Sequence, residues 1–158
     1  MELSIIIPAH NEEHRISKTL ESYSNFYAKK YKNLVEILVI VNGSRDNTIN
    51  VVNQYSKKYP IIKGYEYKPK IGKGGAIIEG LKKAQGNLIG YVDADLATSP
   101  EAFYDLITKI NGYQGIIASR WMKGSIINKK QPISRLVASR GFNFLVRLLL
   151  DLKYKDTQ

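Results

Sequence analysis

Near its N-terminus the chain reads LSIIIPAHNEE (residues 3–13), an apolar run that ends abruptly in polar side chains. Comparable apolar runs recur at 35–41, 61–67, 88–92 and 115–119, and stretches with the apolar spacing of helices separate them. Strands that are apolar nearly throughout are buried on both faces, and their alternation with helices is typical of a parallel sheet. The sequence therefore predicts an α/β fold with a doubly wound, mostly parallel sheet.

Signals for helix ends accompany this pattern. Ser99 before Pro100 predicts a helix start, because serine caps the first turn and proline presets its φ angle. Asp46 or Ser44 is expected to cap the second helix, and Gly86 to close the third. Apolar residues at helical spacing place the first three helices around 16–27, 52–59 and 76–84, and a last one around 133–152.

The composition is that of a globular domain. Of the 158 residues, 44% are hydrophobic and 24% are charged, and we expect residues 1–158 to form one domain. The absence of cysteine excludes disulfides and thiolate metal sites, so that any metal must be held by oxygen atoms or by the two histidines. Because the N-terminal residues lack the pattern of a secretory signal, we expect a cytoplasmic location.

Polar residues follow each expected strand at its carboxyl end. Loops converge at that edge of a doubly wound sheet, and the following helices direct their positive N-termini at it, so a ligand is expected there. These polar segments are Pro8-Ala9-His10-Asn11-Glu12-Glu13, Asn42-Gly43-Ser44, Lys68 to Gly75, Asp93-Ala94-Asp95 and Ser119-Arg120.

Asp93 and Asp95 are the candidate metal ligands. Residues two apart in an extended segment point to the same side, so both carboxylates can face one cation. Oxygen ligands at this spacing suit Mg²⁺ or Mn²⁺. A solvated turn or a helix cap is the alternative interpretation of the pair.

Lys73 lies in Gly72-Lys73-Gly74-Gly75, which we expect to form a loop ahead of the third helix. Glycines let backbone amides approach a phosphate, and the lysine adds a positive charge. The spacing excludes a Walker A loop, and a flexible turn with an exposed lysine is the alternative.

Together these segments resemble the ordered motifs of family 2 glycosyltransferases, and most closely those of dolichyl-phosphate glucosyltransferases and mannosyltransferases. The resemblance covers essentially the whole chain. It implies a GT-A fold, which is a Rossmann-like three-layer sandwich, with a nucleotide-sugar donor and a divalent metal, Mg²⁺ or Mn²⁺. It also implies transfer of a hexose, with inversion, to dolichyl or another polyprenyl phosphate at the cytoplasmic face of a membrane.

The resemblance assigns roles to individual residues. Residues 1–119 would bind the nucleotide sugar, and 120–158 would begin an acceptor-binding part. His10 would shape the pocket rather than catalyse. The nucleotide-binding residues would be Pro8, Ala9, Asn11, Glu12, Asn42, Gly43, Lys73, Asp93 and Ala94; the metal ligands Asp93 and Asp95; the acceptor-phosphate residues Arg120, Arg135 and Ser139; and the catalytic residues Asp95, Arg120 and Asp156.

The chain departs from the family pattern in two places. Val41 and Asn42 stand where the family usually has a pair of aspartates. An asparagine offers one acceptor and one donor group, which suits the mixed edge of uracil better than the edge of guanine, so we expect UDP to be favoured over GDP. Residues 156–158 end the chain where relatives continue, so we expect an incomplete acceptor side.

The C-terminal quarter is strongly basic. Residues 120–158 hold nine of the 24 basic residues and only two of the 14 acidic ones, and the whole chain carries a net charge of +10. Such a surface favours an anionic partner, whether phospholipid headgroups, a phosphate substrate or nucleic acid, and a solvated basic face is the alternative. The apolar end of the 133–152 segment could be core, a dimer contact or a helix at the membrane interface.

Three functional hypotheses follow from these features. If the acceptor is a phosphate, its oxygen is already anionic and no strong base is required, whereas a sugar hydroxyl would require one, for which Asp156 is the candidate. A non-catalytic nucleotide or anionic-surface binder derived from a transferase is the second possibility. A nucleic-acid partner is disfavoured, because the basic residues lack an interleaved aromatic platform.

Overall fold

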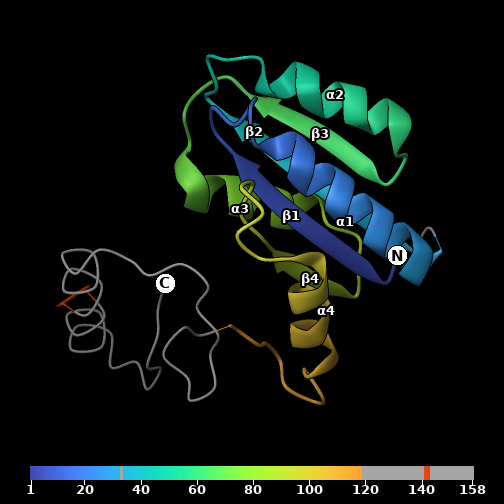
Figure 1. Ribbon diagram of the computed structural model, residues 1–158. Coiled ribbons are helices and arrows are strands. Elements are labelled where there is room, and N and C mark those ends of the chain that lie inside the picture. Colours follow the sequence, from blue (N-terminus) through green and yellow to red (C-terminus); the bar gives the residue numbers. More distant parts are fainter. Residues whose placement is uncertain (33, 119–140, 143–158) are drawn as a thin grey trace. The chain divides into compact units, whose positions relative to one another are not determined.

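The computed structural model describes residues 1–32, 34–118 and 141–142 (Figure 1). By its internal contacts the chain divides into two compact units, Met1–Thr108 and Lys109–Gln158. In the first unit, strands and helices alternate along the chain. The elements are β1 (Leu3–Ala9), α1 (Ile16–Tyr31), β2 (Val35–Asn42), α2 (Thr48–Lys58), β3 (Ile62–Tyr67), α3 (Gly72–Lys83), β4 (Leu88–Tyr91) and α4 (Pro100–Thr108).

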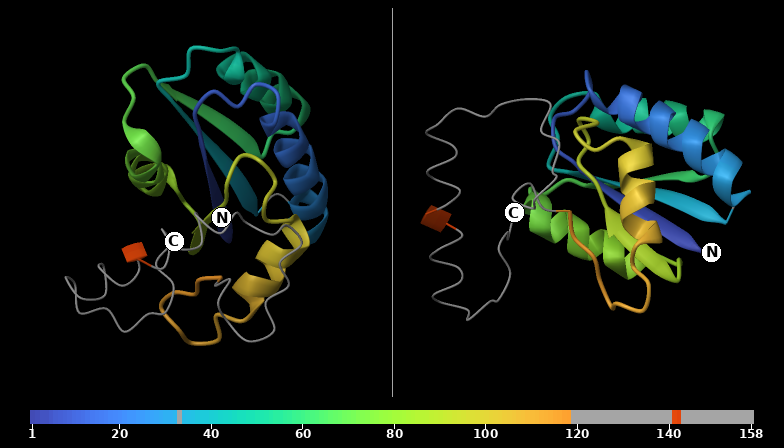
Figure 2. Two further views of the ribbon diagram at one scale, coloured as in Figure 1. Left: turned by 60° about the vertical axis from the view of Figure 1, so that its left-hand side comes forward. Right: turned by 60° about the horizontal axis from the view of Figure 1, so that its bottom comes forward.

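The four strands of this unit form one parallel sheet in the order β3-β2-β1-β4. At the centre of the sheet, Ile5 of β1 lies opposite Ile37 of β2 and Gly90 of β4. Helices α1, α2 and α4 cover one face and α3 covers the other (Figure 2). The three-layer α/β prediction is therefore confirmed.

Both faces of the two central strands, β1 and β2, are buried, as their apolar runs predict. Leu3, Ile5 and Ile7 of β1 belong to the core under α1 and α4, whereas Ile6 belongs to a second core with Ala76 of α3. Every residue of β2 is buried. The two central strands thus carry apolar side chains on both sides, which explains why their sequences do not alternate.

The predicted helix start at Ser99 is confirmed, whereas the expected cap of α2 at Asp46 or Ser44 is wrong, because Asn47 occupies the cap position and its side chain makes no capping hydrogen bond. Ser99 Oγ accepts a hydrogen bond from the N–H of Ala102 at 3.2 Å in the first turn of α4. Asp46 Oδ1 accepts one from the N–H of Thr48, the first residue of α2, at 3.1 Å. Asp46 thus supports the first residue of α2 from one position before the cap, and does not itself cap the helix.

Three sequence-based expectations differ from the structure. Residues 115–118 form no strand and pair with no other described segment, because an apolar run becomes a strand only where a neighbouring backbone satisfies its hydrogen bonds. Helix α3 begins at Gly72, so that the Gly72–Gly75 segment forms its first turn rather than a loop ahead of it. Gly86 does not close α3, which ends at Lys83.

Gly86 instead lets the chain pass close to β1. A Cβ atom at this position would lie 2.5 Å from the backbone nitrogen of Ser4, and the N–H of Gly86 donates to Ser4 Oγ at 2.8 Å.

In the described part of the chain, no helix is long and apolar enough to cross a membrane.

A buried carboxylate links the amino ends of the strands. Glu36 of β2 is 1% exposed and accepts hydrogen bonds from Ser4 Oγ at 2.7 Å, from the N–H of Gln85 at 2.8 Å and from Lys63 Nζ at 2.8 Å. Burial alone would raise the pKa of Glu36, but the hydrogen bonds from Lys63, Ser4 and Gln85 outweigh it and hold the pKa below its ordinary value of 4.5.

This arrangement predicts that Glu36→Gln lowers the free energy of unfolding by about 1–3 kcal/mol at neutral pH, because a charged acceptor of three hydrogen bonds is lost. The folded-state pKa is depressed, so the contribution of Glu36 is complete above pH 4.5 and is lost as pH falls through the lowered value. Urea unfolding at several pH values measures both effects. Glu21→Gln at the exposed Glu21–Lys58 pair is the control. The prediction would be contradicted if both variants lost the same free energy of unfolding. It would also be contradicted if the difference in stability between wild type and Glu36→Gln did not decrease at acidic pH.

Candidate functional site

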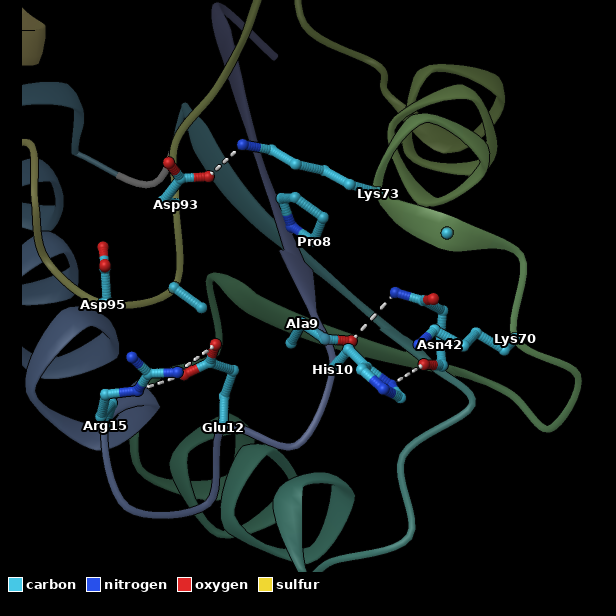
Figure 3. Close-up of a pocket in the computed structure, with 12 residues that line it drawn as sticks. Pro8, Ala9, His10, Glu12, Arg15, Asn42, Lys70, Lys73, Asp93 and Asp95 are labelled. Atoms are coloured by element: carbon cyan, nitrogen blue, oxygen red, sulfur yellow. Dashed lines mark hydrogen bonds and ion pairs between the residues drawn. The ribbon is translucent and has the colours of Figure 1, made fainter. Parts of the chain in front are cut away.

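A cavity of about 330 Å³ lies at the carboxyl ends of β1, β2 and β4, beside the start of α3 (Figure 3). Its position is the one expected for a ligand in a doubly wound sheet, and its volume is in the range of small-molecule pockets. The lining residues are Pro8, Ala9, His10, Glu12, Arg15, Asn42, Lys70, Gly72, Lys73, Asp93, Ala94 and Asp95.

The cavity brings together most of the residues singled out from the sequence. Both candidate metal ligands, Asp93 and Asp95, line it, whereas Asn11 and Gly43 do not. Arg120, Arg135, Ser139 and Asp156 lie outside the described residues. The predicted nucleotide-binding residues that line the cavity are Pro8, Ala9, Glu12, Asn42, Lys73, Asp93 and Ala94.

Asn11 joins two loops. Its φ of 55° is left-handed, a conformation that asparagine tolerates better than most residues. Its N–H donates to Ser44 Oγ at 3.1 Å, and its Oδ1 accepts the N–H of Arg45 at 2.9 Å. In the same junction the N–H of Glu12 donates to Thr48 Oγ1 at 2.9 Å. The polar residues after β1 and β2 thus bind one another and set the shape of one cavity wall.

Gly43 allows another wall to form. Its φ is 58°, and a Cβ atom would lie 2.7 Å from Lys70 Cα. Its N–H donates to the carbonyl of Tyr67 at 2.7 Å, which ties the end of β2 to the end of β3. Only glycine combines this backbone conformation with so close an approach of the segment that carries Lys70.

Asn42 and His10 form a hydrogen-bonded pair at the cavity. Asn42 is 2% exposed and its Nδ2 donates to the carbonyl of Ala9 at 3.1 Å. His10 Nδ1 lies 2.8 Å from the Asn42 carbonyl and must donate to it, so a neutral His10 keeps Nε2 as an acceptor. Asn42 Oδ1 is buried without a hydrogen-bond partner among the described residues, which is unusual outside binding sites.

Asp93 and Asp95 flank the buried residue Ala94 in the turn after β4. Asp93 Oδ1 lies 2.6 Å from Lys73 Nζ, and both side chains are about half exposed (Figure 3). Asp95 Oδ1 accepts the N–H of Ala97 at 3.1 Å. The lysine after β3 and an aspartate after β4 therefore meet at the cavity although 20 positions separate them in the chain.

The donor set suits a cation that brings ligands of its own. No group of three or more acidic or histidine side chains that could enclose a metal is found in the part of the chain that the structure describes. Mg²⁺ and Mn²⁺ need no such cage, because they bind one or two carboxylates and complete their shell with water and phosphate oxygens. Asp93 and Asp95 fit that chemistry.

The first turn of α3 forms a positive border of the cavity. Gly72 and Lys73 line it, and the N-terminal N–H groups of a helix have no partner within the helix. This turn contains no acidic residue, and no side chain caps it. The helix N-terminus and Lys73 thus place positive charge at the same border, which is the chemistry that an anion requires.

Two lining residues escaped the sequence analysis. Arg15 forms a double contact with Glu12, from Nη2 to Oε1 at 2.9 Å and from Nε to Oε2 at 2.8 Å. The spacing of three between Glu12 and Arg15 at a helix start is a signal that could have identified the pair. Lys70 belongs to the polar segment after β3, but nothing in the sequence distinguishes it from Lys68.

Comparisons with known proteins agree on one family. The family described as Glycosyl transferase family 2 matches residues 4–157. A dolichyl-phosphate beta-glucosyltransferase of Drosophila melanogaster is 32% identical over 100% of this chain and 52% of its own length. Another of Trichomonas vaginalis, ALG5A, is 40% identical over 99% of this chain and 50% of its own length. Glycosyltransferase AglD of Haloferax volcanii is 29% identical over 100% of this chain and 26% of its own length.

Two solved structures share the fold. S. aureus TarS 1-349 in complex with UDP-GlcNAc is 26% identical, with a TM-score of 0.57, and the match covers 70% of this chain and 31% of that one. Mannosyltransferase PcManGT of Pyrobaculum calidifontis, in complex with GDP-Man and Mn²⁺, is 23% identical, with a TM-score of 0.60 over 69% of this chain and 32% of that one. The chain spans about half or less of the length of the curated relatives named above.

The close approach at Gly43 predicts that Gly43→Ala lowers the free energy of unfolding by about 1–3 kcal/mol, because the new Cβ forces either the left-handed backbone or Lys70 to move. Gly74→Ala is the matched control, since a Cβ there meets nothing within 4 Å and alanine favours the helix. Denaturant unfolding of the two variants measures the difference. A Gly43→Ala protein as stable as the Gly74→Ala protein would show that the wall is not tightly packed.

Proposed function

This chain belongs to glycosyl transferase family 2, and we propose that it is the donor-binding part of an enzyme that transfers a hexose, glucose or mannose, from a nucleotide diphosphate sugar to dolichyl or another polyprenyl phosphate. Residues 1–119 bind the donor in this proposal, and 120–158 begin the acceptor side. The names of the dolichyl-phosphate beta-glucosyltransferases similar to this chain support the choice of acceptor.

One observation carries the proposal. The uncapped first turn of α3, the Lys73 ammonium and the carboxylates of Asp93 and Asp95 border the same cavity. A diphosphate needs positive groups around it, and a pair of carboxylates beside those groups would be repulsive unless a cation lay between them and the phosphates. A nucleotide diphosphate with a bound cation would satisfy both the positive groups and the carboxylates of the site.

Asp93 and Asp95 would hold Mg²⁺ or Mn²⁺, which when bound offsets the negative charge that develops on the departing diphosphate. Lys73 Nζ lies 2.6 Å from Asp93 Oδ1, and the lysine can turn to a phosphate oxygen of the donor. The half-exposed position of both side chains makes such an exchange of partners inexpensive.

The transfer itself requires little proton chemistry. An oxygen of the acceptor phosphate is already anionic, and it forms the new bond to the anomeric carbon as the bond to the nucleotide diphosphate breaks, with inversion. Arg120, Arg135 and Ser139 would hold this phosphate in line and offset the repulsion between two anions. Positioning and charge compensation thus supply most of the catalysis in this proposal.

Asn42 supports a UDP donor. Its Nδ2 donates to the Ala9 carbonyl, and its Oδ1 is a single acceptor that is buried without a partner among the described residues, so the side chain must shift toward the cavity to accept a hydrogen bond from a base. Uracil presents one N–H donor on its pairing edge, which one acceptor satisfies. Guanine presents adjacent donors, for which a carboxylate would be the better partner.

We expect the protein to bind UDP at least about tenfold more tightly than GDP, and only with Mn²⁺ or Mg²⁺ present, as measured by calorimetry. Asp95→Asn should weaken cation-dependent binding by about tenfold or more, because it removes the charge but keeps an oxygen for the Ala97 N–H. Asp105→Asn, at an exposed position of α4, changes the net charge equally and should bind like wild type. Equal affinity for both nucleotides, or binding that survives a chelator, would contradict the proposal.

A second prediction concerns attachment to the cytoplasmic face of a membrane through the basic quarter, residues 120–158. Each basic residue near an anionic surface contributes about 1 kcal/mol, so binding to vesicles with anionic lipid should exceed binding to neutral vesicles and should weaken with salt. Lys129→Glu combined with Lys130→Glu should reduce sedimentation with anionic vesicles. Arg120→Ala or Arg135→Ala should instead reduce sugar transfer to a short polyprenyl phosphate.

The control for the vesicle experiment is Lys18→Glu combined with Lys57→Glu, which changes the net charge equally at exposed positions of α1 and α2. This pair should leave vesicle binding nearly unchanged. Equal binding to neutral and anionic vesicles would identify residues 120–158 as a solvated surface.

A further inference from the structure

Helix α1 presents three hydroxyl groups to the segment that carries the candidate metal ligands. Thr19, Tyr23 and Tyr27 are spaced by four residues and therefore share one face of the helix. Their hydroxyls donate to the backbone carbonyls of Ala94 at 2.7 Å, of Thr98 at 2.9 Å and of Pro100 at 3.1 Å, respectively. The acceptors lie in chain order from the turn after β4 to the first residue of α4.

The three donors are themselves fixed. Thr19, Tyr23 and Tyr27 are 0% exposed. The rings of Tyr23 and Tyr27 are stacked with centroids 5.8 Å apart, and both pack on Phe103 of α4. Burial raises the pKa of both phenols further above their ordinary value, so the hydroxyls stay protonated and remain donors at every pH that the fold tolerates.

The segment between β4 and α4, residues 93–99, forms no helix or strand, and its Asp93 is paired with Lys73. The last hydrogen bond between the β1 and β4 segments before it runs from the N–H of Val92 to the carbonyl of Ile6, and α4 starts only at Pro100. Leu96 has a left-handed φ of 59°, which a leucine adopts only where its surroundings enforce it. The side chain of Asp95 adds one local bond, to the N–H of Ala97.

We propose that Thr19, Tyr23 and Tyr27 are positioning residues, whose hydroxyls hold the turn at Asp93 and Asp95 in the geometry that the cation and nucleotide require before either arrives. The inference rests on the proposed function, because it takes these two carboxylates as the cation site. A site that is ordered in advance loses less conformational entropy when its ligand binds, and this raises affinity without any new contact to the ligand.

The three bonds differ in their distance from the carboxylates. Thr19 holds the peptide carbonyl of Ala94, which lies between the two aspartates, so its loss acts on both at once. Tyr23 holds the far side of the turn, and Tyr27 holds the start of α4. The effect on ligand affinity should therefore decrease from Thr19 to Tyr23 to Tyr27.

The test uses the full chain with Thr19→Val and Tyr23→Phe, each of which removes one hydroxyl and keeps the side-chain shape. Calorimetry should show Mn²⁺-dependent UDP binding weakened by about 3- to 10-fold in each, the range that the loss of one hydrogen bond supports. Amide hydrogen exchange should accelerate in residues 93–99 and stay unchanged in β2. Thr19→Ser keeps the hydroxyl and should restore wild-type behaviour in both measurements.

Tyr59→Phe is the control for general loss of a tyrosine hydroxyl, since that hydroxyl bonds Asn25 Oδ1 at 3.1 Å, away from the turn. It should bind and exchange like wild type. If Thr19→Val and Tyr23→Phe bind Mn²⁺ and UDP as wild type does, or if Tyr59→Phe loses as much, the inference is overturned. If wild type itself binds neither ligand, the proposed function fails. In that case amide hydrogen exchange is the test of this inference, and unchanged exchange rates in residues 93–99 of Thr19→Val and Tyr23→Phe overturn it.

Discussion

Burial of β1 and β2 between two layers of helices is the constraint on which the rest of the structure depends. Parallel strands require crossover connections, so every loop after a strand opens at the same edge of the sheet. The apolar runs of β1 and β2 are buried on both faces as neighbouring parallel strands. The polar residues that follow β1, β2 and β4 therefore lie together at the carboxyl edge of the sheet, where they line the cavity. The cavity is thus a consequence of how the core is filled.

The charged side chains at the two edges of the sheet differ in burial and in hydrogen bonding. At the amino edge, the carboxylate of Glu36 is buried and saturated by Ser4, Lys63 and Gln85, so it serves stability. At the carboxyl edge, Asp93 and Lys73 remain half exposed in a single ion pair. A buried charge whose hydrogen bonds are all made stabilises the fold and is not free to bind a ligand. A half-exposed charge with one partner can exchange that partner for a ligand.

Helix α1 connects the core to the site in two places. Its first turn begins at the carbonyl of Glu12, whose carboxylate holds Arg15 at the cavity. Its buried face carries Thr19 and Tyr23, which bond the backbone around the candidate cation ligands. A single helix packed on the sheet therefore contacts both the β1 side and the β4 side of the cavity.

The sequence by itself determined the α/β class, the strand positions from β1 to β4 and the edge at which the polar residues gather, because apolar periodicity and strand-end polarity are local signals. Only the tertiary structure decided the functions of particular polar residues. Asn11 binds the neighbouring loop rather than lining the cavity, and Arg15 lines it. The apolar run at 115–118 has no strand partner in the described part of the chain. Each outcome depends on residues far along the chain, since pairing and hydrogen bonding are decided by neighbours in space that no local pattern encodes.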